Sequence, residues 1–415
     1  MIRESHLDRV LARKLKEARE QRGLTQEAVA QILGVSRETV ALWEGGARIP
    51  SLLYLGDLAK LYGVKEESFL TQGPLEFLED LRALLRKEEE ALLDPGVRLE
   101  LRRWLDFLNG YAELLELAGE APYLKAPPKE LKPKEAILTD LRQASSQAIK
   151  VREYFKLGQD ALPELYTFLD NVGVLVYKVS LPQGAGVWGA FYRHPRLGYS
   201  VLVNVNATPG RQAFTLAHEL AHALYHNGFP GIVCRRENLA PEEAEVERFA
   251  NAWAAHFLVP GKALREGVRR LGRLDPEVAL LLAHHFRVSY ALLLFRLRNE
   301  GLLSEEQLKE WVQYAPQDLA RRLGLNPEPY GLPQSLPNLQ GLKRYPPSVL
   351  QLVRKSVEED LISVSEAAEL LNVNSYILEK ELLSAGLPKE ENPEVEELVQ
   401  ELGFVSPGRR GKVLR

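Results

Sequence analysis

A pair of histidines four residues apart, with a glutamate directly after the first, is the chain's most informative chemical pattern. His218, Glu219 and His222 occupy the sequence His-Glu-Leu-Ala-His inside a run of helical periodicity. On a helix with 3.6 residues per turn, the two imidazoles project from one face, one turn apart. That spacing suits two nitrogen ligands of one Zn²⁺, with Glu219 beside them to take a proton from activated water. The alternative is a helix whose histidines make only core contacts.

A catalytic zinc also needs a third protein ligand and an open position for water. Cys234 is the only cysteine in the chain and stands alone in the sequence, which makes it a weak candidate. His226 continues the four-residue spacing, but it lies about 12 Å from His218 along a straight helix. One ion therefore cannot bind all three histidines of this helix.

The better candidate for the third ligand lies on the next predicted helix, residues 241–257. The spacing predicts that the apolar residues of this helix face the core: Phe249, Ala250, Trp253, Ala254 and Phe257. Glu243 and Glu247 lie four residues apart, and Glu247 is the closer of the two to the apolar face. A lone acidic side chain there is unusual unless it is paired or binds a metal.

These motifs resemble those of the ImmA/IrrE family of zinc metallopeptidases over about residues 135–300. The resemblance rests on residues 218–222, on Glu247-Arg-Phe-Ala-Asn251 with the helix that follows, and on residues 282–289. It implies that Glu247 is the third zinc ligand and that Glu219 is the general base. It also implies a substrate class, because family members cleave helix-turn-helix repressors and so relieve repression of mobile-element or stress genes.

Three short β-type runs precede the motif helix, at residues 172–179, 187–192 and 199–205. We expect the third run to lie at a sheet edge and to pair there with an extended substrate segment. Three residues are candidates for stabilising an oxyanion, and the sequence does not choose among them: Tyr192, His194 and Tyr225.

The remaining histidines invite a metal interpretation that the spacing does not favour. His284 and His285 are adjacent, so on a helix they point about 100° apart and cannot share one ion well. His256, on the Glu247 helix, is expected to be a packed helix residue rather than a ligand.

The N-terminal part carries a second functional pattern. Thr25 can cap one helix and Ser36 a second, with Gly34 in the tight turn between them. This helix-turn-helix resembles the Cro-like (xenobiotic response element) DNA-binding family over about 55 residues. Six residues are expected to face double-stranded DNA: Gln26, Ser36, Arg37, Glu38, Thr39 and Arg48. Arg37 is the natural guanine reader, and such modules usually bind as dimers. The alternative is a helical bundle without a DNA role.

Composition and charge limit the partners and the location that we expect for the protein. The 415 residues are 45% hydrophobic with a net charge of −4, so DNA contact must come from a local patch. Without a membrane-spanning run or a secretory signal, a cytoplasmic protein with no membrane partner is expected.

We predict a multi-domain, mostly α chain with an α+β core. Residues 1–72 are expected to form a five-helix helix-turn-helix domain, and 73–134 a helical connector with a proline-rich linker. Residues 135–325 are expected to form a zincin-like metallopeptidase domain with a small antiparallel sheet. Residues 326–415 are expected to be a helical module with a helix-turn-helix-like pattern and a basic tail. The connector helices either provide a dimer contact or pack back on the first domain.

Three functional hypotheses follow from these patterns. The first is a DNA-bound zinc endopeptidase that cleaves a helix-turn-helix repressor or a toxin-related partner. We expect such a protein to be a homodimer. The second is a non-proteolytic transcriptional regulator whose zinc domain senses metal or stress. The third is an antitoxin-like scaffold that holds a neighbouring toxin. A purely structural site has no need for Glu219, which favours the first hypothesis.

Overall fold

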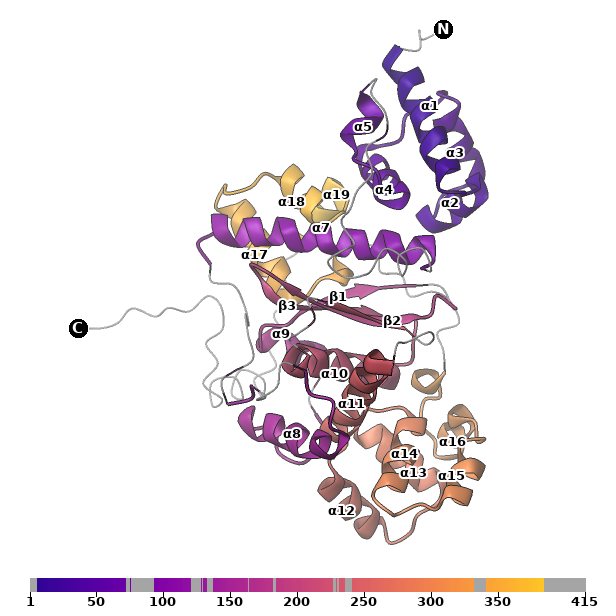
Figure 1. Ribbon diagram of the computed structural model, residues 1–415, viewed down its shortest axis with the longest axis vertical. Coiled ribbons are helices and arrows are strands. Elements are labelled where there is room, and N and C mark those ends of the chain that lie inside the picture. Colours follow the sequence, from indigo (N-terminus) through magenta and orange to yellow (C-terminus); the bar gives the residue numbers. More distant parts are fainter. Residues whose placement is uncertain are drawn as a thin grey trace, which may run out of the picture.

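The computed structural model is elongated, with the N-terminal helices at one end and a sheet between helical layers in the middle (Figure 1). It describes residues 6–71, 75, 93–120, 128, 130–132, 137–162, 164–181, 184–226, 229, 231–235, 241–331 and 341–383. Much of the connector and linker predicted over 73–134 lies outside these residues, as does the basic C-terminal end.

Five N-terminal helices form the predicted helix-turn-helix module. They are α1 (His6–Gln21), α2 (Gln26–Leu33), α3 (Arg37–Glu44), α4 (Leu52–Tyr62) and α5 (Glu67–Leu70). Thr25 and Ser36 accept hydrogen bonds from backbone N–H groups at the starts of α2 and α3. Gly34 ends α2 with φ of 67°, a conformation that favours glycine. The caps and the turn are therefore those that the sequence predicts.

The central sheet has four strands, β1 (Leu175–Val179), β2 (Val187–His194), β3 (Gly198–Asn204) and β4 (Gly231–Arg235). Their order in the sheet is β1-β3-β2-β4. The predicted sheet was antiparallel, which is wrong for one pair, because β1 runs parallel to β3. The other two pairs, β2 with β3 and β2 with β4, are antiparallel.

The prediction that residues 199–205 lie at a sheet edge is also wrong. They form most of β3, which lies between β1 and β2, and all seven β3 residues are buried. The physical reason is visible in the sequence, because Tyr199 to Val205 is a nearly continuous apolar run. Such a run is typical of a strand covered on both faces, whereas a half-exposed edge strand alternates. The edges are β1 and β4, and β4 was not predicted.

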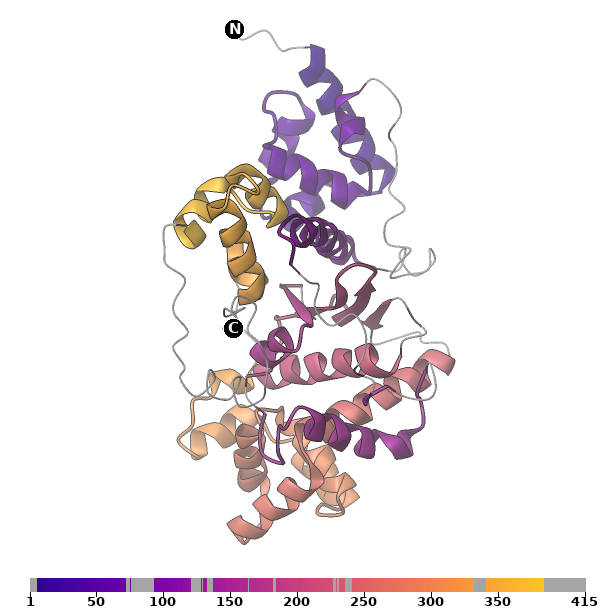
Figure 2. The same cartoon turned by 90° about the vertical axis from the view of Figure 1, so that its left-hand side faces the viewer.

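Helices cover both faces of the sheet (Figures 1 and 2). On one face lie α8 (Leu141–Tyr154), α9 (Leu165–Asn171), α10 (Pro209–Tyr225) and α11 (Pro241–Leu258). On the other face lie α7 (Pro95–Leu117) and the C-terminal helices α17 (Pro347–Glu358), α18 (Val364–Leu370) and α19 (Ser375–Leu378), followed by a π-turn, η4 (Glu379–Leu383). One apolar cluster joins α7, the sheet and these C-terminal helices. This cluster contains residues from both sides of the predicted boundaries at 134/135 and 325/326. The division into domains therefore stays a prediction.

The remaining helices extend the lower layer. They are α12 (Gly261–Leu271), α13 (Pro276–His285), α14 (Tyr290–Asn299), α15 (Glu305–Trp311) and α16 (Pro316–Arg322), with short 3-10 turns η2 (Glu328–Tyr330) and η3 (Gly341–Arg344). α13 and α14 follow each other closely in the chain but meet at 105°. Arg287 adopts φ of 55° at the break, and Ser289 caps α14.

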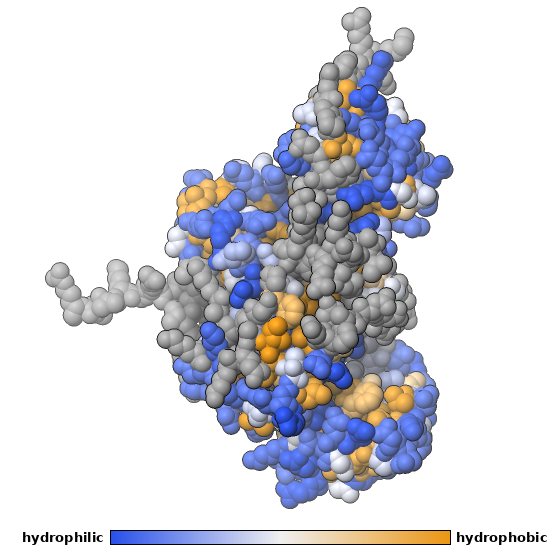
Figure 3. All heavy atoms as spheres, viewed as in Figure 1, coloured by the Kyte–Doolittle hydropathy of each residue, from blue (hydrophilic) through white to orange (hydrophobic). Residues whose placement is uncertain are grey.

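No single described helix is long and apolar enough to cross a bilayer; α13 and α14 together pass only as a bent pair. The face seen in Figure 3 is mainly hydrophilic, with apolar residues in separate patches.

A buried charge cluster links the N-terminal helices to the rest of the protein. Arg103 on α7 donates to Asp57 on α4 at 2.8 Å and to Glu100 at 2.6 Å. Glu100 also accepts from Arg344 of η3. Burial opposes charge on Glu100, but the two guanidinium groups hold its pKa below the usual value. Breaking one member would leave the others buried without compensation.

A hydrogen-bond chain between α7 and the sheet offers a test of this packing. The buried indole Nε1 of Trp104 donates to Ser200 Oγ at 2.9 Å, and Ser200 Oγ donates to the Leu175 carbonyl at 3.1 Å. We expect Ser200→Ala to lower the free energy of unfolding by about 1–3 kcal/mol, because a buried donor loses its acceptor. In a Trp104→Phe background the same change should cost less. Denaturant unfolding followed by circular dichroism measures both; equal costs would contradict the coupling.

Candidate metal centre and nucleic-acid interface

The predicted chemical helix is α10, which lies directly beneath the sheet. Thr208 caps it by accepting from the Arg211 N–H, and Pro209 occupies the first turn. Every residue from 215 to 225 is buried. The helix is therefore enclosed between the sheet and α11, and its polar side chains must find partners within the protein.

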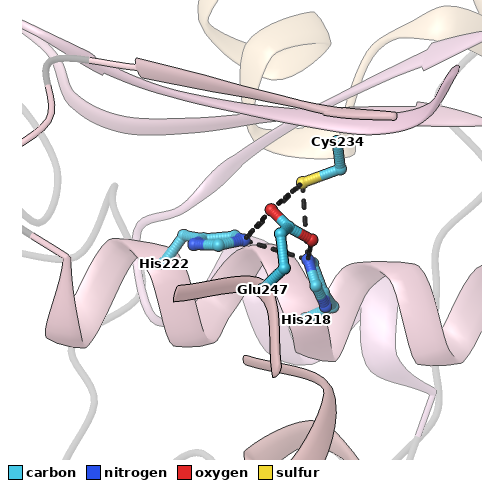
Figure 4. A group of neighbouring side chains, drawn as sticks. All are labelled: His218, His222, Cys234 and Glu247. Carbon is cyan, nitrogen blue, oxygen red and sulfur yellow. Dashed lines mark hydrogen bonds and ion pairs between the residues drawn. The ribbon is translucent and has the colours of Figure 1, made fainter. Parts of the chain in front are cut away.

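Four side chains from three elements converge above α10, as Figure 4 shows. His218 and His222 come from α10, Glu247 comes from α11, and Cys234 comes from β4. Their potential ligand atoms all lie within 4.8 Å of one another. The predicted set of two histidines and Glu247 is thus brought together, and Cys234 joins it as a fourth donor.

The donor separations fit a tetrahedral ion. Ligands 2.0–2.1 Å from zinc lie about 3.3 Å apart in a tetrahedron, and a thiolate sulfur about 3.5 Å from each. The two Nε2 atoms of His218 and His222 are 2.9 Å apart, and Glu247 oxygens lie 3.1 and 3.3 Å from them. The sulfur of Cys234 lies 3.4 and 3.6 Å from the nitrogens and 3.6 Å from Glu247 Oε1. These residues therefore fit a divalent metal such as zinc.

A hydrogen-bond chain directs the His222 lone pair toward the other donors. His226 Nε2 lies 2.9 Å from the Leu138 carbonyl, which can only accept, so His226 carries its proton on Nε2. Its unprotonated Nδ1, 2.7 Å away, then accepts from His222 Nδ1. Burial lowers the pKa of His226 to about 3, which keeps this ring neutral near pH 7. His222 is left with a lone pair on Nε2, where a metal ligand needs it.

Asn251 does the same for the first histidine. His218 Nδ1 lies 3.1 Å from Asn251 Oδ1. With the amide oxygen accepting, the ring carries its proton on Nδ1 and presents Nε2 to the cluster. Ile137, next to Leu138, forms an isolated antiparallel β-bridge with His226. Neither orienting role was predicted.

Glu219 lies beside the cluster, fully buried beneath β2. A Cβ atom on Gly189 would stand 2.5 Å from Glu219 Oε1, so only glycine leaves room for this carboxylate. Neither oxygen of Glu219 has a hydrogen-bond partner among the described residues. Burial raises the pKa of Glu219 to about 8. A buried carboxylate without a partner is costly, and a nearby cation would relieve that cost.

The electrostatics of the other two donors also favour a cation. Burial alone would raise the pKa of Glu247, but the adjacent His218 and His222 rings hold it well below its usual range. Burial and the neighbouring carboxylates raise the pKa of the Cys234 thiol. A bound divalent ion reverses that effect, because coordination deprotonates a thiol.

The structure separates the remaining candidates from this centre. His284 lies 2.6 Å from the Tyr330 hydroxyl and His285 2.6 Å from Asp160, so the adjacent pair shares no site. His256 lies partly buried outside the cluster.

None of the three oxyanion candidates has a described contact with the cluster. Tyr192 packs on Trp104 across the sheet and His194 contacts Asn109 of α7, while the Tyr225 hydroxyl faces Gln147 of α8.

Cys234 is the member of this cluster that sequence reasoning undervalued. It lies 12 residues after His222 in a strand that was not predicted, so spacing alone gave no sign of proximity. Its position instead follows from the pairing of β4 with β2, which places Cys234 opposite Gly189. The signal available in the sequence was its status as the only cysteine, close to the histidine motif.

Four of the six residues expected to face DNA lie at the start of α3. Ser36, Arg37 and Glu38 are exposed, Thr39 is partly exposed, and Arg48 is exposed after the end of α3. Ser36 also caps the helix, since the Thr39 N–H donates to Ser36 Oγ at 3.2 Å. The exposed start of the second helix is the part that enters the major groove in helix-turn-helix proteins.

Gln26 has an additional internal role. Its Nε2 donates to Glu44 Oε2 at 3.0 Å, and the same carboxylate accepts from Arg19 at 2.6 and 2.9 Å. These bonds tie α1, α2 and α3 together and fix the Gln26 side chain at the start of α2. The side-chain amide of Gln26 is therefore partly engaged by Glu44, and only its remaining hydrogen-bonding capacity is left for a contact with DNA.

Comparisons with known proteins agree with this division of the chain. A family model described as helix-turn-helix matches residues 15–69. A second model, described as an IrrE N-terminal-like domain of the M78 peptidases, matches residues 169–298. The second match spans the sheet, α10 and α11, and therefore all four donors of the cluster.

Three relatives resemble the chain over short stretches. The cryptic phage CTXphi transcriptional repressor RstR of Vibrio cholerae is 33% identical over 76 residues, which cover 18% of this chain and 68% of the repressor. HTH-type transcriptional regulators of Methanocaldococcus jannaschii and Bacillus subtilis are 48% and 41% identical over 54 residues, 13% of this chain and 82% of each relative. The chain belongs to the Cro-like helix-turn-helix transcriptional regulators, in which it joins that DNA-binding domain to an IrrE-like domain of the M78 peptidase family.

Proposed function

We propose that the protein is a zinc-dependent endopeptidase joined to a DNA-binding domain, and that it controls gene expression by cleaving a protein partner. The observation that supports this best is the set of ligand atoms from His218, His222 and Glu247 beside a buried, unpaired Glu219. A metal site that only stabilises the fold has no use for such a carboxylate.

The roles of the side chains follow from their positions. Zinc, when bound, supplies a Lewis acid that polarises a peptide carbonyl and acidifies water. His218, His222 and Glu247 hold the ion. Glu219 accepts the proton of the attacking water and returns it to the leaving amine. Its enclosure under β2 keeps bulk solvent away from that proton.

Because the chain carries a DNA-binding domain, we infer that its protein substrate also binds DNA, at an operator. Exposed Ser36 and Arg37 are positioned to read the major groove, with Arg48 on a phosphate. We propose a helix-turn-helix repressor or a related protein as the substrate.

A homodimer is part of the same proposal. Ile49 and Leu52, beside the proposed DNA surface, are 56% and 80% exposed, which suits contact with a second copy.

A second candidate function is favoured by Cys234. Four protein donors saturate a tetrahedral zinc, as in structural sites. In that case the domain is a metal-sensing or partner-binding element of a regulator that cleaves nothing. The two functions differ in whether Glu219 matters.

Replacing Glu219 by Gln separates these functions. We expect Glu219→Gln to keep one zinc per chain and to lose at least 100-fold in cleavage rate, since proton transfer contributes on the order of 10²–10⁴-fold. The measurement is appearance of new N-termini in a peptide library prepared from the host proteome, followed by mass spectrometry. Glu266→Gln, which changes a partly exposed glutamate of α12 outside the cluster, is the matched control. Unchanged cleavage in Glu219→Gln would exclude the proposed general base.

The orienting role of His226 predicts a change in zinc affinity. His226→Phe keeps the ring shape but leaves His222 Nδ1 without an acceptor, so zinc should bind about 10–100-fold more weakly. Competition with a chromophoric chelator measures the affinity. His284→Phe, which changes an exposed histidine outside the cluster, should bind zinc like the unmodified chain. Equal affinities for both variants would refute the orienting role.

Arg37 should carry sequence discrimination in DNA binding. For a duplex selected from random sequences, we expect Arg37→Ala to weaken binding about 5–150-fold, the equivalent of about 1–3 kcal/mol for a bidentate guanine contact. Binding to a scrambled duplex should change far less. Arg13→Ala removes the same charge from an exposed position on α1 and serves as the control. An equal loss on both duplexes would assign Arg37 to the phosphates instead.

A further inference from the structure

We propose that Cys234 is a fourth metal ligand that keeps the site closed in the resting protein, so that cleavage requires its thiolate to leave first. This inference rests on the zinc site proposed above and adds its regulation. No open corner is left for water while the sulfur stays in place.

The geometry of the sulfur is that of a ligand. Cys234 Sγ lies 3.4 and 3.6 Å from the two Nε2 atoms, and 3.6 Å from a Glu247 oxygen. A thiolate bound to a tetrahedral zinc with nitrogen and oxygen ligands lies about 3.5 Å from each of them. Cys234 therefore stands at the corner that the predicted three-ligand site would leave to water.

Access to the cluster is correspondingly narrow. The side chain of His222 is fully buried, that of His218 is 6% exposed and that of Glu247 is 14% exposed. Cys234 is itself buried on the sheet side. A peptide carbonyl cannot reach a ligand position without displacing one of these groups.

Glu219 is the independent sign that the closed arrangement is a resting state. It is fully buried, and neither of its oxygens has a hydrogen-bond partner among the described residues. In a permanently closed site, burial of this carboxylate would cost free energy without any contribution to catalysis. If Cys234 moved away, its thiolate would take a proton from solvent, and the position beside Glu219 would be left for a water molecule.

The strand that carries the thiol is suited to such a displacement. β4 is the last strand of the sheet, and among the described strands it pairs only with β2. The β2–β4 pairing already contains a register irregularity between Val187 and Gly189, next to the Cys234 position. A shift of β4 would move the sulfur away from the donors and leave the β1–β3–β2 ladder intact.

Cobalt(II) substitution tests the ligand directly, without relying on activity. The full-length chain loaded with Co²⁺ should show an intense near-ultraviolet sulfur-to-cobalt charge-transfer band. Cys234→Ser should keep one cobalt per chain and lose the band completely. Because Cys234 is the only cysteine, the band can have no other source in this chain. Cobalt bound to the unmodified chain without the band would overturn the inference while leaving the proposed function standing.

A second measurement tests closure. With zinc bound, we expect Cys234→Ser to cleave the proteome-derived peptide library at least tenfold faster than the unmodified chain. The double variant Cys234→Ser with Glu219→Gln should return cleavage to background. A charge-transfer band in the unmodified chain, combined with no gain in Cys234→Ser, would overturn the resting-state role and leave a closed structural site.

The outcomes also separate this inference from the proposed function. If the unmodified chain binds neither zinc nor cobalt, both fail. If Cys234→Ser binds the metal and cleaves at the rate of the unmodified chain in a Glu219-dependent way, the proposed function stands and the closure is refuted. Alkylation of Cys234 by iodoacetamide, read by mass, adds a check, because bound zinc should slow it at least tenfold.

Discussion

The orientation of two imidazole rings on α10 is the constraint on which the metal centre depends. Each ring donates from Nδ1 to an acceptor on its far side, His226 for one and Asn251 for the other. Only then do both Nε2 lone pairs face the same point. Two lone pairs 2.9 Å apart repel each other, so the surrounding structure holds an arrangement that a cation would relieve.

The residues that surround the His218 and His222 rings come from segments far apart in the chain. The Leu138 carbonyl precedes α8, Asn251 and Glu247 lie on α11, and Cys234 lies on β4. A stacked Trp253 and Phe257 help to fill the α11 core face, with ring centroids 4.6 Å apart. Because the interior is packed closely, the positions of the ligands follow from the packing of these elements rather than from any local turn.

The DNA-binding helices and the metal centre are joined through α7. This helix contacts α4 through Arg103 and Asp57, and its other face packs on the sheet that covers the site. The C-terminal helices complete the same layer, beside α7 in Figure 2. One face of α7 therefore packs back on the N-terminal helices, which is one of the two sequence hypotheses for the connector, and its other face packs on the sheet. The DNA-binding helices and the sheet thus contact the same helix.

The proposed four-ligand site and the proposed role of Glu219 as general base place opposite demands on one cluster. Four donors stabilise the fold and the ion together, whereas Glu219 contributes only when one position is free. The conflict is resolved if the weakest attachment, the sulfur on an edge strand, is the one that moves. Histidine and Glu247 ligands lie on two packed helices, which move far less easily.

Local sequence determined the elements that carry chemistry. The spacing of His218 and His222, the apolar face of α11 beside Glu247, and the caps at Thr25 and Ser36 are short-range properties that depend on helical geometry. Tertiary structure decided which other residues lie beside these elements. The order of the strands, the approach of Cys234 and the acceptor for His226 result from pairing between segments whose separation along the chain carries no signal of contact. The apolar run of β3 indicates a strand covered on both faces, but which strands pair with it and which helices cover it depend on segments elsewhere in the chain.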